Sequence, residues 1–199
     1  RHECIALHLS AGNARQSKKS RKRCYMSTII YNIKSKDCPE PGGSAMPVSG
    51  DDIRFMREAI AEAELARGED EVPVGAVAVR DGVIIARAHN TREGTRCATH
   101  HAEILAIEAA CRALGGWRLP GVTLYVTMEP CVMCAGAAVN ARIGRIVYGP
   151  ADKRFGALGS VTDIHALPLN HTFEVTGGVL GDETRELLTS YFRNKRKSQ

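Results

Sequence analysis

The sequence contains no hydrophobic run long enough to cross a membrane. Its apolar stretches are all shorter than the roughly 18 residues that a membrane helix needs. There is also no signal-peptide pattern at the N-terminus and no internal repeat. We therefore expect a cytoplasmic protein that does not insert into membranes. A chain of 199 residues with 44% apolar and 25% charged residues is typical of one globular domain with tails.

A disulfide framework is not indicated either. The chain has seven cysteines, an odd number. Cys131 and Cys134 are three positions apart and follow Pro130, a spacing typical of metal ligands. We predict that Cys97 and Cys111 are packing residues.

Positive charge is concentrated at the N-terminal end. Residues 1–45 contain nine Lys or Arg and three acidic residues, a net charge of +6, whereas the whole chain has a formal charge of +5. The rest is near neutral, so the overall charge is weak evidence for RNA binding. We predict a basic, disordered extension over residues 1–50 and one folded domain over 51–199. The extension could be a translated upstream or cloning-derived segment, a basic RNA-contacting arm or a targeting peptide.

Hydrophobic periodicity and turn residues predict an alternation of helices and strands. The expected helices are 53–67 (capped by Asp51 or Asp52), 100–113 (capped by Thr99), one with Pro130 in its first turn, and 182–196. The expected strands are 74–79 and 83–88, joined by an Asp81-Gly82 turn, then 122–128, 143–148 and a weak one within 173–180. This order implies an α/β sandwich in which a hairpin is continued by strands that return through helices.

Four residues suggest a zinc site that performs chemistry. His101 and, thirty positions later, Cys131 and Cys134 offer one nitrogen and two sulfur ligands. Three ligands leave one tetrahedral position for water, and Glu103 could move the protons of that water. A purely structural site does not need this carboxylate, so the pattern favours a hydrolytic enzyme.

Other interpretations of the cysteine pair remain open. It could be a redox pair, although the upstream His-x-Glu then has no use. It could also belong to a structural zinc site with Cys97 or His100 as fourth ligand. Of the two adjacent histidines we choose His101 because Glu103 follows it at +2, and we expect His100 to support the site or line the pocket wall.

The His-x-Glu and Pro-Cys-x-x-Cys pair is the signature of zinc nucleobase deaminases, and the chain from 52 to 196 resembles the bacterial-type tRNA-specific adenosine deaminases. The segments that carry the resemblance are VPVGAV at 72–77, HN at 89–90, HHAEI at 100–104, LYVTMEPCVMCAGA at 124–137, ARIGRIVYG at 141–149, GS at 159–160 and NH at 170–171. The zinc signature is shared with cytidine, cytosine, guanine and riboflavin-pathway deaminases. The ARIGR run and the Asp152 loop are more specific to the tRNA branch.

The resemblance implies a zinc-dependent deaminase domain with a three-layer α/β/α, cytidine-deaminase-like fold and a central mixed sheet of about five strands. It further implies hydrolysis of adenosine to inosine at wobble position 34, with a tRNA anticodon stem-loop as partner, one zinc ion per subunit and a homodimer. The residues carried over are His101, Cys131 and Cys134 as zinc ligands, Glu103 as proton shuttle, Asn90 as a contact to the target base and Asp152 in the loop that meets the anticodon.

Two departures and two alternative functions accompany this expectation. His100 stands where the branch usually has a small residue, and Arg154 where lysine is common. The basic run at 193–197 fits either tRNA phosphates or a solvated helix end. The alternative functions are a free-base or nucleoside deaminase for guanine or cytosine, and a non-catalytic, zinc-stabilised RNA-binding subunit.

Overall fold

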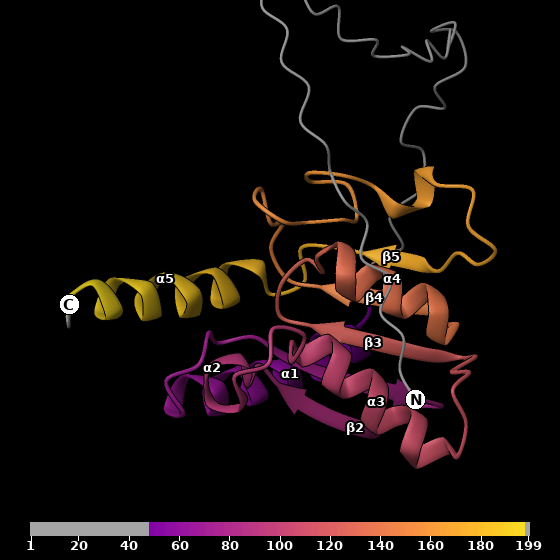
Figure 1. Ribbon diagram of the computed structural model, residues 1–199, viewed down its shortest axis with the longest axis horizontal. Coiled ribbons are helices and arrows are strands. Elements are labelled where there is room, and N and C mark those ends of the chain that lie inside the picture. Colours follow the sequence, from indigo (N-terminus) through magenta and orange to yellow (C-terminus); the bar gives the residue numbers. More distant parts are fainter. Residues whose placement is uncertain (1–47, 198–199) are drawn as a thin grey trace, which may run out of the picture. The chain divides into compact units, whose positions relative to one another are not determined.

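A five-stranded mixed sheet forms the centre of the fold (Figure 1). The computed structural model describes residues 48–197, so most of the predicted extension lies outside the described residues. The strands are β1 Gly75–Arg80, β2 Val83–His89, β3 Val122–Val126, β4 Arg145–Tyr148 and β5 Glu174–Thr176. The helices are α1 Gly50–Gly68, α2 Arg92–Thr95, α3 Ala102–Leu114, α4 Val132–Ala141, the 3-10 turn η1 Ile164–Ala166, and α5 Gly181–Lys197.

The strand order is β2-β1-β3-β4-β5. Strand β1 pairs antiparallel with β2 and β3, whereas β3, β4 and β5 run parallel. The parallel strands are connected through helices, as parallel pairing requires. Asp81 and Gly82 have φ of 51° and 74°, the positive values that a tight hairpin turn needs. The predicted hairpin and the mixed five-stranded sheet are therefore confirmed.

Two hydrophobic cores, one on each face, make the domain a three-layer structure. Alternate strand residues face opposite ways, so Ala76 and Ala78 belong to one core and Val77 and Val79 to the other. Helices α3 and α4 cover the first face, and α1 covers the second (Figure 1). The predicted α/β/α architecture is confirmed.

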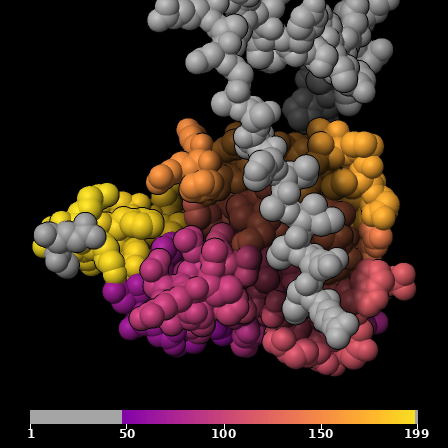
Figure 2. Space-filling model, viewed as in Figure 1, coloured from indigo at the N-terminus to yellow at the C-terminus, as the bar shows by residue number. Residues whose placement is uncertain are grey.

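Helix α5 packs beside the connection from α1 to β1. Its residues Leu187 and Tyr191 are buried, and the Tyr191 hydroxyl donates to the Asp70 carbonyl at 2.9 Å. Lys195 pairs with the Asp70 carboxylate. In the space-filling view the yellow surface of α5 adjoins the purple surface of the α1 part (Figure 2). None of the helices in residues 48–197 is long and apolar enough to span a membrane.

Several predicted helix starts are wrong. Helix α1 is capped by Ser49, which accepts from the Asp52 backbone N–H while the Asp52 carboxylate accepts from the Ser49 N–H. This reciprocal capping box starts the helix earlier than a cap at Asp51 or Asp52 would. Helix α3 begins after His101 rather than after Thr99. The short α2 was not predicted, because four polar loop residues carry no hydrophobic periodicity.

The Asp52 carboxylate ties α1 to three strands of the sheet. It is 1% exposed and accepts from the Tyr125 hydroxyl at 3.0 Å and from both terminal nitrogens of Arg145, at 2.8 and 3.0 Å. Arg145 donates in addition to the Thr176 hydroxyl at 2.9 Å. Arg145 lies in the ARIGR run, so this branch-specific residue serves the fold.

Replacing Asp52 by Asn should lower the free energy of unfolding by about 2–4 kcal/mol, because the buried Arg145 guanidinium loses its counter-charge. Urea denaturation followed by circular dichroism measures the change. The matched control is Asp51→Asn, whose carboxylate is 72% exposed in a surface pair with Arg54. This control should stay within about 0.5 kcal/mol of wild type. Equal effects of both substitutions would contradict the assignment.

The same contacts make stability depend on acid. Burial by itself raises the pKa of Asp52, but hydrogen bonds from Arg145, Ser49 and Tyr125 outweigh it and hold the pKa below the ordinary value of 3.8. The contribution of Asp52 is therefore complete above about pH 4 and is lost as the pH falls through the folded-state pKa. Wild type should lose stability more steeply than Asp52→Asn between about pH 5 and pH 3. Parallel pH profiles would contradict this.

Candidate metal-dependent active site

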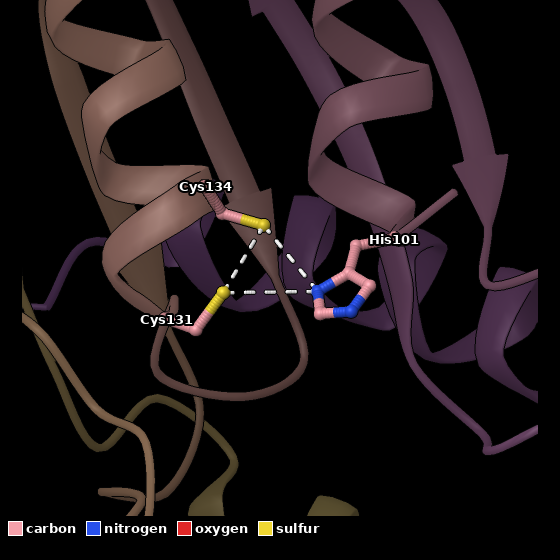
Figure 3. A group of neighbouring side chains, drawn as sticks. All are labelled: His101, Cys131 and Cys134. Carbon is pink, nitrogen blue, oxygen red and sulfur yellow. Dashed lines mark hydrogen bonds between the residues drawn. The ribbon is translucent and has the colours of Figure 1, made fainter. Parts of the chain in front are cut away.

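His101, Cys131 and Cys134 converge at the N-terminal ends of α3 and α4 (Figure 3). The Nδ1 atom of His101 lies 3.8 Å from Cys131 Sγ and 3.5 Å from Cys134 Sγ, and the two sulfur atoms are 3.7 Å apart. A tetrahedral ion with metal–sulfur bonds of about 2.3 Å and metal–nitrogen bonds of about 2.0 Å requires separations of about 3.5–3.8 Å. The triangle therefore has the size of a metal site.

The helix starts explain why these side chains meet. His101 and Cys131 are the N-cap residues of α3 and α4, with extended backbones and no capping hydrogen bond from their side chains. Each side chain is thus free to point toward the neighbouring helix. Pro130 stands before the cap of α4 and not within its first turn, which corrects its predicted place. Both positive helix ends face the cluster and favour thiolate charge.

The two thiols share a hydrogen bond that separates their acidities. A hydrogen bond from Cys134 lowers the pKa of Cys131 to about 4. The same hydrogen bond, together with burial, raises the pKa of Cys134. A bound cation reverses the second effect, since metal ligation deprotonates thiols. The pair is thus chemically suited to a divalent ion.

The two alternative fourth ligands lie outside the cluster. The His100 ring contacts the Thr95 hydroxyl at 2.9 Å, and Cys97 Sγ contacts the Thr99 hydroxyl at 3.3 Å. The metal-sized group in the described residues contains only His101 and the cysteine pair. Three protein ligands leave a coordination position open, which is the pattern of catalytic rather than structural zinc sites.

Glu103 is buried beside the ligands in the first turn of α3. Its side chain is 5% exposed, and this burial raises its pKa. Glu103, His101 and Cys131 line a cavity of about 490 Å³, the size of a small-molecule site. The cavity thus brings a carboxylate and the metal-binding triangle to the same space.

The other two predicted site residues also line this cavity. Asn90 is 5% exposed and follows directly on β2. Asp152 is 9% exposed and lies in the loop after β4, where it accepts from the Arg154 backbone N–H at 2.8 Å. Both residues come from strand ends far apart in the sequence. His100 is not among the residues that line the cavity, in contrast to its expected place on the wall.

Sequence reasoning missed Glu129, a buried carboxylate that shapes the Asp152 loop. It accepts from the backbone N–H groups of Asp152 at 2.8 Å, Leu158 at 2.9 Å and Ser160 at 3.2 Å, and also from the Ser160 hydroxyl. A Cβ at Gly156 would overlap this carboxylate. The only signal was the presence of Glu129 and Ser160 in resembling segments, and neither segment names the other as its partner.

The mouth of the cavity combines aromatic rings with cations. Phe155 is 63% exposed and Phe192, on α5, is 43% exposed. Both line the cavity together with Arg92 and Arg154. Exposed rings beside cations are the elements with which proteins hold single-stranded nucleic acid.

The comparisons with known proteins agree with this geometry. The family model for MafB19-like deaminases matches residues 50–196. The tRNA-specific adenosine deaminase of Bacillus subtilis (strain 168) is 48% identical over 149 residues, which are 74% of this chain and 92% of that protein.

Two solved structures extend the comparison. A chain from a structural study of A-to-I editing by tRNA A34 deaminases at the wobble position of transfer RNA matches with a TM-score of 0.66 and 46% identity, over 68% of this chain and 99% of that one. The guanine deaminase of Nitrosomonas europaea matches with a TM-score of 0.59 and 25% identity, over 70% of this chain and 83% of that one.

Metal content tests the triangle. Purified wild type dialysed against zinc should hold one ion per chain by plasma mass spectrometry, and Cys131→Ala or Cys134→Ala should lose at least about 90% of it. The control variants Cys97→Ala and Cys111→Ala change free thiols outside the triangle and should keep it. Loss of metal in the controls, or retention in the Cys134 variant, would show that the triangle is not the site.

Proposed function

This chain belongs to the tRNA-specific adenosine deaminase family, and from that premise we propose that it converts adenosine to inosine at the wobble position of a tRNA anticodon. Water and adenosine give inosine and ammonia. The single observation that carries the proposal is the buried Glu103 beside the His101–Cys131–Cys134 triangle in one cavity.

We propose that His101, Cys131 and Cys134 hold one zinc ion per subunit. One nitrogen and two sulfur ligands at these separations suit zinc better than magnesium or calcium, which prefer oxygen. When bound, zinc lowers the pKa of a coordinated water molecule toward neutrality and so supplies the nucleophile.

Glu103 moves the protons of the reaction. Its carboxylate takes a proton from the attacking water and passes it to ring nitrogen N1, next to C6 of the adenine. It then assists the departure of the 6-amino group as ammonia, when the bond from C6 to that nitrogen breaks. Burial raises the pKa of Glu103, which suits a group that both accepts and releases a proton near neutral pH.

The cavity walls recognise the substrate. Asn90 offers amide groups to the edge of the target base, and the Asp152 loop meets the neighbouring anticodon nucleotides. Phe155 and Phe192 provide stacking surfaces at the mouth, and Arg92 provides positive charge for phosphates. A base flipped out of its stack can enter such a pocket.

A free-base deaminase is the second candidate, supported by the similarity to the guanine deaminase of Nitrosomonas europaea. The identity of 25% to that protein is far below the 48% to the adenosine deaminase of Bacillus subtilis. A non-catalytic subunit is disfavoured because Glu103 is present and buried in the cavity. The anticodon stem-loop as partner, a homodimer and a place in the cytoplasm remain expectations from the resemblance.

Three substrates distinguish these functions. The zinc-loaded protein is incubated with an anticodon stem-loop RNA carrying adenosine at position 34, with free guanine and with free cytosine. We expect inosine in the RNA by mass spectrometry and no ammonia from the free bases. Ammonia from a free base without inosine in the RNA would overturn the proposal.

Glu103→Ala should lower kcat by about 10²–10⁴-fold on the stem-loop RNA while zinc content stays unchanged, because proton transfer is lost and the ligands are kept. Glu108→Ala is the matched control on the same helix, since its side chain is 55% exposed and pairs with Arg112. It should retain wild-type activity. Full activity of Glu103→Ala would contradict the proposed proton transfer.

A further inference from the structure

Glu71 is a buried carboxylate that the proposed reaction does not use. It lies between α1 and β1, is 1% exposed, and its own backbone N–H donates to the Ala66 carbonyl at 2.9 Å. The next residue, Val72, lines the cavity. Glu71 is thus anchored through its backbone to the end of α1, directly behind the cavity wall.

Both carboxylate oxygens of Glu71 contact the segment that follows β2. Oε2 accepts from Asn90 Nδ2 at 2.9 Å, and Oε1 accepts from the Gly94 backbone N–H at 2.7 Å. The backbone of Asn90 is held as well, since its N–H donates to the Val74 carbonyl at 2.9 Å. The position of Asn90 is therefore set by its backbone, and the orientation of its amide by Glu71.

The chemistry of the contact selects one of two amide orientations. An ionised carboxylate can only accept hydrogen bonds, so it must face the NH₂ group of Asn90. Turning the amide by half a rotation would place Asn90 Oδ1 against Glu71 Oε2, with two acceptors and no hydrogen between them. A buried acceptor pair of this kind is strongly disfavoured.

We propose that Glu71 is a positioning residue that fixes the orientation of the Asn90 amide and thereby determines which hydrogen-bonding groups the cavity presents to the base. One N–H of Asn90 is used by Glu71, which leaves one N–H and the carbonyl oxygen in known places. The inference rests on the proposed function, because it takes Asn90 as a contact to the base.

A fixed amide can discriminate between bases, whereas a freely turning one cannot. Nucleobases differ in the order of donors and acceptors along their edges, and an unmatched buried polar group costs a substrate far more than a missing apolar contact. If Asn90 could turn, it would satisfy a donor or an acceptor at the same point. Glu71 removes that freedom before the substrate binds, which is pre-organisation.

Glu71→Gln tests the proposal with little change in volume. The glutamine oxygen can still accept from Gly94, and its NH₂ group can donate to a turned Asn90 amide, so both orientations become available. Catalytic efficiency on the stem-loop RNA with adenosine 34 should fall about 10- to 100-fold. Glu62→Gln is the matched control: Glu62 contacts His89 at 3.0 Å, next to Asn90 but away from the cavity, and the variant should keep wild-type efficiency.

A double-mutant cycle separates orientation from general stability. On an Asn90→Ala background there is no amide to orient, so adding Glu71→Gln should change the efficiency less than about two-fold. The same 10- to 100-fold loss on that background would overturn the proposal, as would a single variant Glu71→Gln with unchanged efficiency.

An exchanged pair remains informative if Glu71→Gln alone folds poorly. Combining Glu71→Gln with Asn90→Asp restores the hydrogen bond with donor and acceptor reversed, so unfolding by urea should match wild type. The cavity then presents only acceptors at position 90, and efficiency should stay at least about 10-fold below wild type. Full recovery of efficiency in this exchanged pair would overturn the proposal.

A measurement without catalysis keeps this test independent of the proposed function. In ¹⁵N-labelled zinc-loaded protein, the side-chain amide resonances of Asn90 are identified by their loss in Asn90→Ala. They should be shifted by the carboxylate in wild type and move in Glu71→Gln but not in Glu62→Gln. Unmoved resonances overturn the Glu71 proposal, whereas wild type that forms no inosine overturns the proposed function alone.

Discussion

Two helix starts that meet on one face of the sheet are the constraint on which the site depends. His101 ends the extended segment before α3, and Cys131 ends the one before α4. Buried alanines in both helices, among them Ala106 and Ala135, keep side chains short on this face. Small residues allow helices and sheet to approach closely, and this approach brings the nitrogen and sulfur atoms within 3.8 Å of one another.

Four buried carboxylates show how the same chemical group performs different tasks in one small domain. Asp52 pairs with Arg145 and joins layers of the fold. Glu129 collects loop N–H groups, and Glu71 holds an amide and a glycine N–H. Glu103 lines the cavity beside the metal-binding triangle. The environment decides the task, since a carboxylate surrounded by donors is structural and one facing a cavity is available for proton transfer.

The elements of the fold were largely predictable, because hydrophobic periodicity and turn residues are local signals. The hairpin through Asp81 and Gly82 and the long helices α1 and α5 were found in this way. The helix caps were not, since Ser49 and His101 are selected by contacts as well as by residue type. Glu71 and Glu129 received no role because their partners lie 19 to 31 positions away, beyond any local pattern.

By itself the sequence determined the ligand set, because His101, Glu103 and the Cys131–Cys134 pair have a spacing that few other functions would require. It also determined the order of helices and strands. Only the tertiary structure decided which groups share a space: the triangle with Glu103, Asn90 and Asp152 on one cavity, and His100 outside it. The reason is physical, since spacing along the chain limits which atoms can meet, whereas the packing of layers sets the distances between them.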